Sequence, residues 1–235
     1  MSYTNRKQIL PENIERVFSQ IDKPAVSVTL LIVTATETDF DVLLVKRVRL
    51  PFKDMWSLPG DIIALDETLE ESARRIMKEK TGMEDFYLEQ LYTFGDPGRD
   101  PRGRLITVAY LCLLPNKTLL PEKINDILQK KWYPSKNLPP LAFDHDQLIS
   151  FGIDRIINKM GYSTIAKDLL SESFRLSELQ KLYELALNGP IDKRNFRKWL
   201  KNLALVEPTG EVFRSGRHRP AKLYRFTSNN LVVFK

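Results

Sequence analysis

Apolar residues along positions 25–160 alternate between short strand-like runs and longer helical patterns. The strand-like runs are rich in β-branched and aromatic residues and cover 25–36, 41–48, 56–63, 87–94, 104–114 and 130–134. The spacing of apolar side chains predicts helices over 68–80 and 144–160, and a short amphipathic helix over 11–21. Thr68 and Glu71 have the spacing of a capping box. Strands that alternate with helices favour an α/β fold with a mixed sheet between layers of helix.

The pattern changes after residue 175. Residues 176–188 and 192–204 predict two helices joined by a short Gly-Pro turn, and 205–226 predict two strands around a basic tip. Between 161 and 175 the pattern weakens. We therefore expect an α/β/α sandwich over 1–160, a linker over 161–175 and a small winged helix-turn-helix domain over 176–235.

Composition narrows the class of protein. The chain has 235 residues, of which 43% are hydrophobic, and no apolar run approaches the ~18–20 residues that a membrane span needs. The first residues lack an apolar signal core, so we expect a cytoplasmic protein without membrane contacts. The single cysteine, Cys112, excludes an internal disulfide framework, and two histidines are too few for a His/Cys metal cage. We expect no resident metal and no cofactor.

The net charge of +6 is unevenly distributed. Residues 171–235 hold 13 Lys or Arg against 6 Asp or Glu, whereas residues 1–170 hold 23 against 24. A positive excess confined to the last quarter of the chain indicates a module that binds a polyanion. The alternative is a solvated basic surface.

The helix over 192–204 separates an aromatic face from a basic one. Phe196, Trp199, Leu200 and Leu203 form an apolar stripe. The candidate DNA-binding side chains lie off that stripe or in the following hairpin: Lys193, Arg194, Asn195, Arg197, Lys198, Lys201, Arg217, His218, Arg219 and Lys222. Arg and Asn suit base edges in the major groove, and a basic hairpin beside such a helix suits phosphates. The alternative is a structural appendage.

A second candidate site is the predicted helix over 68–80, which has the outline of a carboxylate-rich metal site. Mg²⁺ needs carboxylates one helical turn apart on one face, but Ile76 and Lys80 occupy two of these places. The "LPG" that precedes this helix, with Glu67, Arg75, Glu79 and Gly82, resembles the Nudix box of nucleoside-diphosphate hydrolases. In that box, Ile76 and Lys80 would be glutamates and Asp61 a glycine. We expect Glu67, Arg75 and Glu79 to be vestigial, without catalysis. The alternative is a hydrolase with another metal site.

The loop "FGDPGRDPRGR" over 94–104 resembles the corresponding loop of ADP-ribose-directed Nudix proteins. The candidate effector-binding residues are Lys46, Arg47, Arg99, Asp100, Arg102 and Arg104, because arginines fork onto phosphate oxygens. The alternatives are an exposed turn and a solvated strand end. In "LAFDH", Asp144 is expected to cap a helix, and His145 to lie at the cap or on the surface.

Both halves together resemble the Nudix-related transcriptional regulators, in which a catalytically impaired Nudix-like domain precedes a winged helix. "DKRNFRKWL" and "RPAKLYRF" carry the resemblance in the second half. It implies a dimeric repressor that binds double-stranded operator DNA and responds to ADP-ribose or to another phosphorylated or sugar metabolite. The alternative is an active ADP-ribose pyrophosphatase with a basic C-terminal domain.

Overall fold

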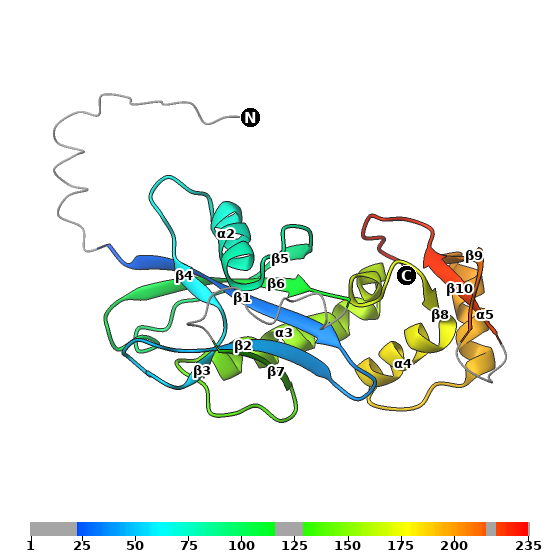
Figure 1. Cartoon of the computed structure of the whole chain (residues 1–235), viewed down its shortest axis with the longest axis horizontal. Coiled ribbons are helices and arrows are strands. Elements are labelled where there is room, and N and C mark those ends of the chain that lie inside the picture. Colours follow the sequence, from blue (N-terminus) through cyan, green and yellow to red (C-terminus); the bar gives the residue numbers. More distant parts are fainter. Residues whose placement is uncertain (1–22, 116–128, 215–219, 235) are drawn as a thin grey trace.

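Seven strands form one mixed sheet in the first part of the chain (Figure 1). The computed structural model describes residues 23–115, 129–214 and 220–234, so the helix expected over 11–21 lies outside the described residues. The strands are β1 (Ala25–Ala35), β2 (Phe40–Lys46), β3 (Trp56–Ser57), β4 (Gly60–Ile62), β5 (Tyr87–Phe94), β6 (Leu105–Leu113) and β7 (Lys130–Pro134). Their order is β3-β2-β1-β6-β5, with β4 paired to β1 and β7 to β2. β1 and β6 are parallel and the other pairs antiparallel, which confirms the mixed sheet.

The run over 56–63 is interrupted at its Pro-Gly dipeptide, as expected, and forms two short strands that pair with different neighbours. β3 pairs with β2, whereas β4 pairs with β1. Pro59 lies between them and has no amide hydrogen for a ladder, although its carbonyl accepts a bond from the Leu30 amide at 2.8 Å. At Gly60 a Cβ atom would lie 2.9 Å from the Val28 carbonyl oxygen. Glycine therefore lets the chain cross close to β1 on its way to the next helix.

Two helices cover opposite faces of the sheet, α2 (Leu69–Thr81) and α3 (His145–Met160). Successive side chains of a strand point to opposite faces, so Leu30 packs in the cluster with Ile76 of α2 and Leu31 in the cluster with Ile156 of α3. α3 lies close to β1 because residue 152 is glycine: a Cβ there would be 2.0 Å from Leu31 Cδ2. The expected α/β/α sandwich is confirmed.

The second part of the chain is a small winged helix. Its elements are η2 (Thr164–Leu169), β8 (Phe174–Arg175), α4 (Leu176–Leu187), α5 (Lys193–Leu203), β9 (Val206–Phe213) and β10 (Ala221–Phe226). The strands pair in the order β8-β10-β9. The two helices and the hairpin were expected, whereas η2 and β8 were not. Within the described residues, no helix has both the length and the apolar character needed to cross a membrane.

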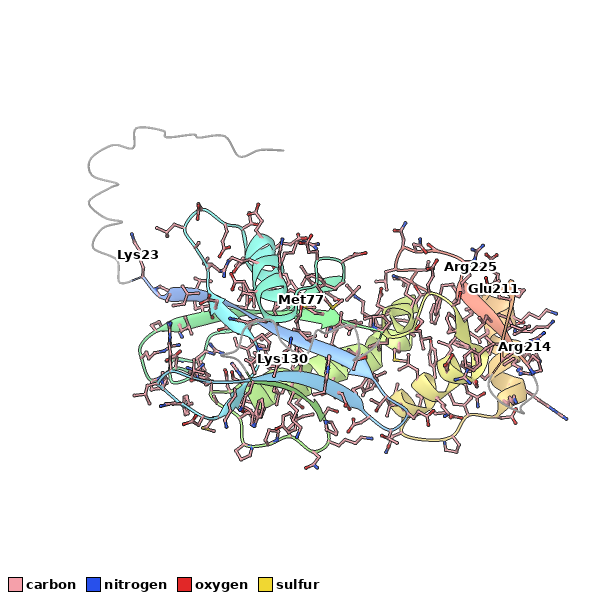
Figure 2. The ribbon with its side chains drawn as sticks, viewed as in Figure 1. Lys23, Met77, Lys130, Glu211, Arg214 and Arg225 are labelled. Carbon is pink, nitrogen blue, oxygen red and sulfur yellow. The ribbon has the colours of Figure 1, made fainter. Side chains whose placement is uncertain are left out.

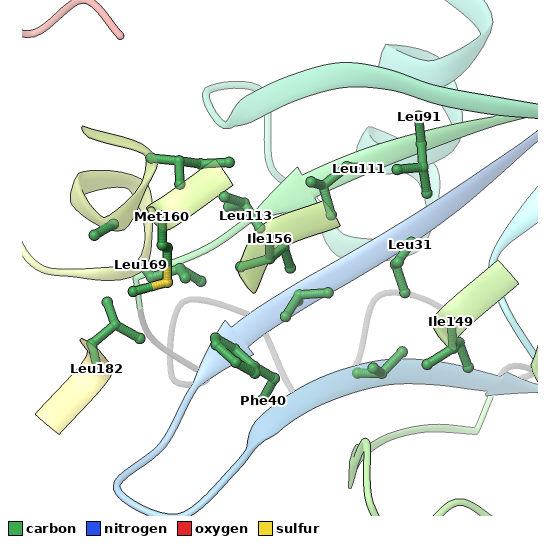
Figure 3. Packing of buried hydrophobic residues seen from close by; sticks show 14 of the residues in the cluster. Leu31, Phe40, Leu91, Leu111, Leu113, Ile149, Ile156, Met160, Leu169 and Leu182 are labelled. Carbon is green, nitrogen blue, oxygen red and sulfur yellow. The ribbon is translucent and has the colours of Figure 1, made fainter. Parts of the chain in front are cut away.

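One hydrophobic core extends through both parts (Figure 3). It begins at Leu31 and Phe40 in the sheet, continues through Ile156 and Met160 of α3 and includes Leu182 of α4. It also includes Phe196 and Leu200 of α5. A continuous core of this kind restricts rotation of the winged helix against the sheet, because rotation would expose apolar surface to water.

Residues 161–175, expected as a linker, form part of this core. Ile165 and Ala166 are 0% exposed and Leu169 is 2% exposed. Phe174 of β8 is also buried. Short apolar segments inside a weak pattern do not show this burial in the sequence, because a 3-10 turn has neither the helical nor the strand period.

We expect Leu169→Ala to destabilise the whole chain by about 2–5 kcal/mol, since it leaves a cavity in the shared core. Both parts should unfold in one transition in guanidinium chloride, followed by circular dichroism and tryptophan fluorescence. The control is Leu187→Ala, whose side chain is exposed on α4. Two separate transitions, with only one of them shifted, would contradict the shared core.

Candidate ligand site and nucleic-acid interface

Helix α2 has well-defined ends. The Thr68 hydroxyl accepts a bond from the Glu71 amide at 3.2 Å, and the Glu71 carboxylate accepts one from the Thr68 amide at 2.7 Å. This confirms the predicted capping box. Gly82 ends the helix in the left-handed conformation, with φ 78°. The Nudix-like segment is therefore an ordered helix, although two of its expected glutamates are replaced.

The replaced positions lie where a metal-binding face would be. Ile76 is 0% exposed and packs in the core between α2 and the sheet, with Met77. Lys80, one turn later on the same face, is half-buried. A carboxylate at position 76 would be buried among apolar side chains, and the ammonium group of Lys80 repels a cation.

The remaining carboxylates contact one arginine. Arg75 donates two hydrogen bonds to Glu67, at 2.7 and 2.9 Å, and lies 3.5 Å from Asp61 and 3.4 Å from Glu79. The bonds from Arg75, followed by the bond from the Ala64 amide, lower the pKa of Glu67 to about 2. Within residues 23–115, 129–214 and 220–234, no three His, Cys, Asp or Glu side chains are grouped to hold a metal ion. This donor set does not fit the magnesium ions of a Nudix hydrolase.

In the loop over 94–104, Arg99 points inward. Its side chain is 3% exposed and donates two bonds to Asp144, at 2.7 and 2.9 Å. A third bond, of 2.5 Å, reaches the Thr107 hydroxyl. All three nitrogens of its guanidinium group have protein partners, so Arg99 attaches the loop to the residue before α3. Its expected contact with a phosphate stays a prediction. Asp144 precedes α3 as expected, but its carboxylate contacts Arg99 and does not cap the helix.

Arg47 and Arg102 lie beside the same aromatic ring. The guanidinium carbons are 4.6 Å and 5.8 Å from the centre of the Phe143 ring. Phe52 meets that ring edge-on at 4.9 Å. Burial, followed by the charge of Arg102, lowers the pKa of Arg47. We name Arg47, Phe52, Arg102 and Phe143 the arginine–aromatic cluster.

The backbone of this cluster is strained. Phe52 and Phe143 have φ values of 58° and 57°, a region that bulky residues rarely adopt. Strain of this kind concentrates at ligand sites. Sequence reasoning predicts Arg47 and Arg102 as candidates but not Phe52 and Phe143, because no sequence signal marks a positive φ in an aromatic residue.

The other expected effector-binding residues have separate positions. Asp100 is buried and accepts bonds from Arg102 at 2.6 and 3.0 Å, which lower the pKa of its carboxyl group. It therefore orients Arg102. Arg104 is exposed and donates to the Gly95 carbonyl, and Lys46 is half-buried at the end of β2.

His145 lies beside the helix cap, as expected, but it is buried and not on the surface. Its Nδ1 atom accepts a hydrogen bond from the Leu58 amide at 2.9 Å. Burial lowers its pKa to about 3, so the ring is neutral near pH 7 and can accept this bond. The bond attaches the beginning of α3 to the segment after β3.

The winged helix presents the basic face that the spacing predicted. Asp192 caps α5 by accepting bonds from the Arg194 and Asn195 amides, at 3.0 and 2.9 Å. Phe196 and Leu200 are buried. The predicted DNA-binding side chains of α5 are all exposed: Lys193, Arg194, Asn195, Arg197, Lys198 and Lys201.

The hairpin of β9 and β10 follows α5. Lys222 is exposed on β10, opposite Val212 of β9. Arg214 is also exposed, at the end of the winged helix that lies away from the seven-stranded sheet (Figure 2). Arg217, His218 and Arg219, also predicted to bind DNA, lie outside the described residues. The basic surface of α5 thus has further cations on the neighbouring hairpin.

Comparison with known proteins matches both parts of the chain. Residues 23–150 match the NUDIX domain family, and residues 166–226 match the NrtR DNA-binding winged helix domain. The ADPR responsive transcriptional repressor NtrR of Acinetobacter baylyi is 34% identical over 212 residues, which cover 88% of this chain and 84% of that protein.

Two solved structures are similar as well. Shewanella oneidensis NrtR complexed with a 27mer DNA has a TM-score of 0.77 and 37% identity, covering 86% of this chain and 93% of that one. The NUDIX domain of Shewanella oneidensis NrtR complexed with ADP ribose has a TM-score of 0.55 and 33% identity, covering 63% of this chain and 99% of that one.

The role of Arg99 can be tested by stability. Arg99→Ala should destabilise the chain by about 3–5 kcal/mol, because it leaves the largely buried carboxylate of Asp144 without its partner. Arg104→Ala removes the same charge from the exposed part of the loop and should change stability by less than about 0.5 kcal/mol. Denaturant unfolding of both variants gives the comparison. Equal stabilities would contradict a structural role for the Arg99–Asp144 pair.

Proposed function

The chain belongs to the NrtR family, in which a Nudix domain precedes a DNA-binding winged helix domain, and from this we propose that it is a transcriptional repressor controlled by ADP-ribose. The observation that carries the proposal is an exposed basic helix, α5, in the same chain as a Nudix domain whose box has lost its metal-binding set.

The arginine–aromatic cluster supports ADP-ribose as the effector. A diphosphate suits the guanidinium groups of Arg47 and Arg102, and Phe143 offers a ring face to a base or ribose. Bringing an anion between these two arginines would relieve their mutual repulsion. Among the other expected effector-binding residues, Lys46 and Arg104 stay candidates for direct contact with ADP-ribose. Arg99 acts by holding the loop over 94–104, and Asp100 acts by orienting Arg102.

We also propose that the domain binds ADP-ribose without hydrolysing it. Hydrolysis of a pyrophosphate requires Mg²⁺ to neutralise the phosphate oxygens and to activate water. Here Ile76 is buried, Lys80 is cationic, and Arg75 already binds Glu67 and lies 3.4 Å from Glu79. A sensor that cleaved its effector would remove its own signal.

For DNA binding, we propose that α5 lies in the major groove and that the hairpin contacts the backbone. The beginning of α5 carries Arg194, Asn195 and Arg197, which suit base edges, while Lys198 and Lys201 suit phosphates. We propose that the repressor acts in the cytoplasm as a homodimer on palindromic operators, since two-fold protein symmetry matches two-fold DNA. Sedimentation equilibrium with and without operator DNA tests the dimer.

Removing the charge of Arg102 should weaken ADP-ribose binding. Arg102→Gln keeps a polar group beside Asp100 but loses the charged contact to phosphate, so we expect affinity to fall by about 10- to 150-fold. Isothermal titration measures it. Arg74→Ala, which removes a charge from the exposed face of α2, should bind as the wild type does. Unchanged affinity in Arg102→Gln would place the ligand elsewhere.

The wild-type chain should release no AMP from ADP-ribose in the presence of Mg²⁺. Chromatography after prolonged incubation, beside an active Nudix hydrolase, gives the measurement. AMP release that Glu79→Gln abolishes would show a working metal site and support the alternative function, an ADP-ribose pyrophosphatase.

Substitutions in α5 and in the hairpin should have different effects on DNA binding. Arg194→Ala should cost about 1–3 kcal/mol on a selected duplex and much less on random DNA, because it removes a base contact. Lys222→Ala should weaken binding to the selected duplex and to random DNA equally, because it removes a phosphate contact. It should also lower by about one the slope of the logarithm of affinity against the logarithm of salt concentration. Fluorescence anisotropy at several salt concentrations separates them. Equal loss of specificity in both variants would contradict these roles.

A further inference from the structure

The segment Leu231–Phe234 returns from the winged helix to the end of α3. The Thr164 amide donates to the Val232 carbonyl at 2.9 Å, and the Val232 amide donates to the Thr164 hydroxyl at 2.8 Å. The Phe234 amide donates to the Tyr162 carbonyl at 2.8 Å. Three hydrogen bonds therefore attach this segment to the junction between α3 and η2.

The same segment contacts α5 through a side chain. The ring centres of Phe234 and Trp199 are 5.8 Å apart, and the ring planes are inclined at 75°, which is an edge-to-face arrangement. The centre of the Trp199 ring also lies 5.7 Å from the ring centre of Phe196 in α5 and 5.2 Å from that of Tyr183 in α4. Phe234 therefore joins the aromatic cluster that supports α5, while its backbone is bonded to the end of α3.

Trp199 occupies a central place in α5. It is next to Lys198 in sequence, and it is half-buried on the opposite side from the exposed cations. A helix of this length behaves as a rigid rod, so a contact that fixes the inner side of α5 also fixes the direction of its outer side. The tilt of α5 decides which of its side chains reach the bases.

We propose that the segment Leu231–Phe234 is a positioning element for DNA recognition, which sets the angle of α5 relative to α3. It also carries the effect of the bound effector from the Nudix domain to α5; this second role rests on the proposed function. Phe234 is the positioning residue, and it acts on DNA only through Trp199. Loss of the ring contact leaves every candidate DNA-binding side chain in place but loosens the tilt of α5, which Phe196 and Leu200 still attach to the core.

The test compares Phe234→Ala with Val233→Ala, whose side chain is 67% exposed on the same segment. The DNA probe is a labelled duplex that the wild-type protein selects from a random pool. Phe234→Ala should bind it about 2- to 12-fold more weakly, the range that an aromatic pair supplies. ADP-ribose should change its DNA affinity less than that of the wild type. Val233→Ala should match the wild type, and Phe234→Tyr, which keeps the ring, should restore binding.

A merely structural role has a different signature. It would lower the unfolding midpoint of Phe234→Ala while leaving DNA affinity and the response to ADP-ribose equal to those of Val233→Ala, and that result would overturn the proposal. If Phe234→Ala does not fold, Thr164→Val replaces it, because this variant removes the hydroxyl that accepts the bond from the Val232 amide. Its DNA affinity and its response to ADP-ribose are then compared with those of Val233→Ala. DNA affinity without ADP-ribose tests the positioning even if ADP-ribose proves to have no effect on the wild type.

Discussion

The apolar core that continues from the sheet through α3 into α4 and α5 is the constraint on which the rest of the structure depends. It includes both Leu31 of the central strand and Leu200 of α5, so the two parts of the chain share one buried interior. An ion pair between Glu37 and Lys181, at 2.7 Å, adds a polar contact at the edge, between the turn after β1 and α4. Such an exposed pair contributes little by itself. The position of the winged helix is therefore set by packing.

α3 has a contact with each proposed site at its two ends. Near its beginning, Asp144 accepts the bonds of Arg99, and Phe143 lies beside both arginines of the cluster. At its other end, Met160 is in the shared core, and the Tyr162 carbonyl accepts the bond from Phe234. A helix of 16 residues spans about 24 Å at 1.5 Å per residue, so α3 provides a rigid connection between the two regions. A ligand that moves Phe143 or its arginines has a mechanical path to α5.

Sequence patterns predicted the elements with a clear period, which include the helices α2, α3, α4 and α5 and the long strands β1 and β6. They also predicted which side chains of α5 are exposed, because helical spacing alone separates Phe196 and Leu200 from the cations. They did not predict that Arg99 and His145 are buried, since a long-range partner such as Asp144 or the Leu58 amide has no sequence signature. The packed span 161–175 and the returning segment Leu231–Phe234 were missed for the same reason: both depend on contacts between distant parts of the chain.

Control of the repressor by ADP-ribose is tested most directly by measuring DNA binding of the wild-type chain with and without ADP-ribose. A duplex selected by the protein is titrated at one fixed salt concentration, with ADP-ribose absent or saturating, after calorimetry has shown that ADP-ribose binds. A repressor that responds to this effector must bind it with different affinity in the DNA-free and DNA-bound states. Saturating ADP-ribose is expected to weaken DNA binding by about 5- to 150-fold. Identical titration curves would contradict it.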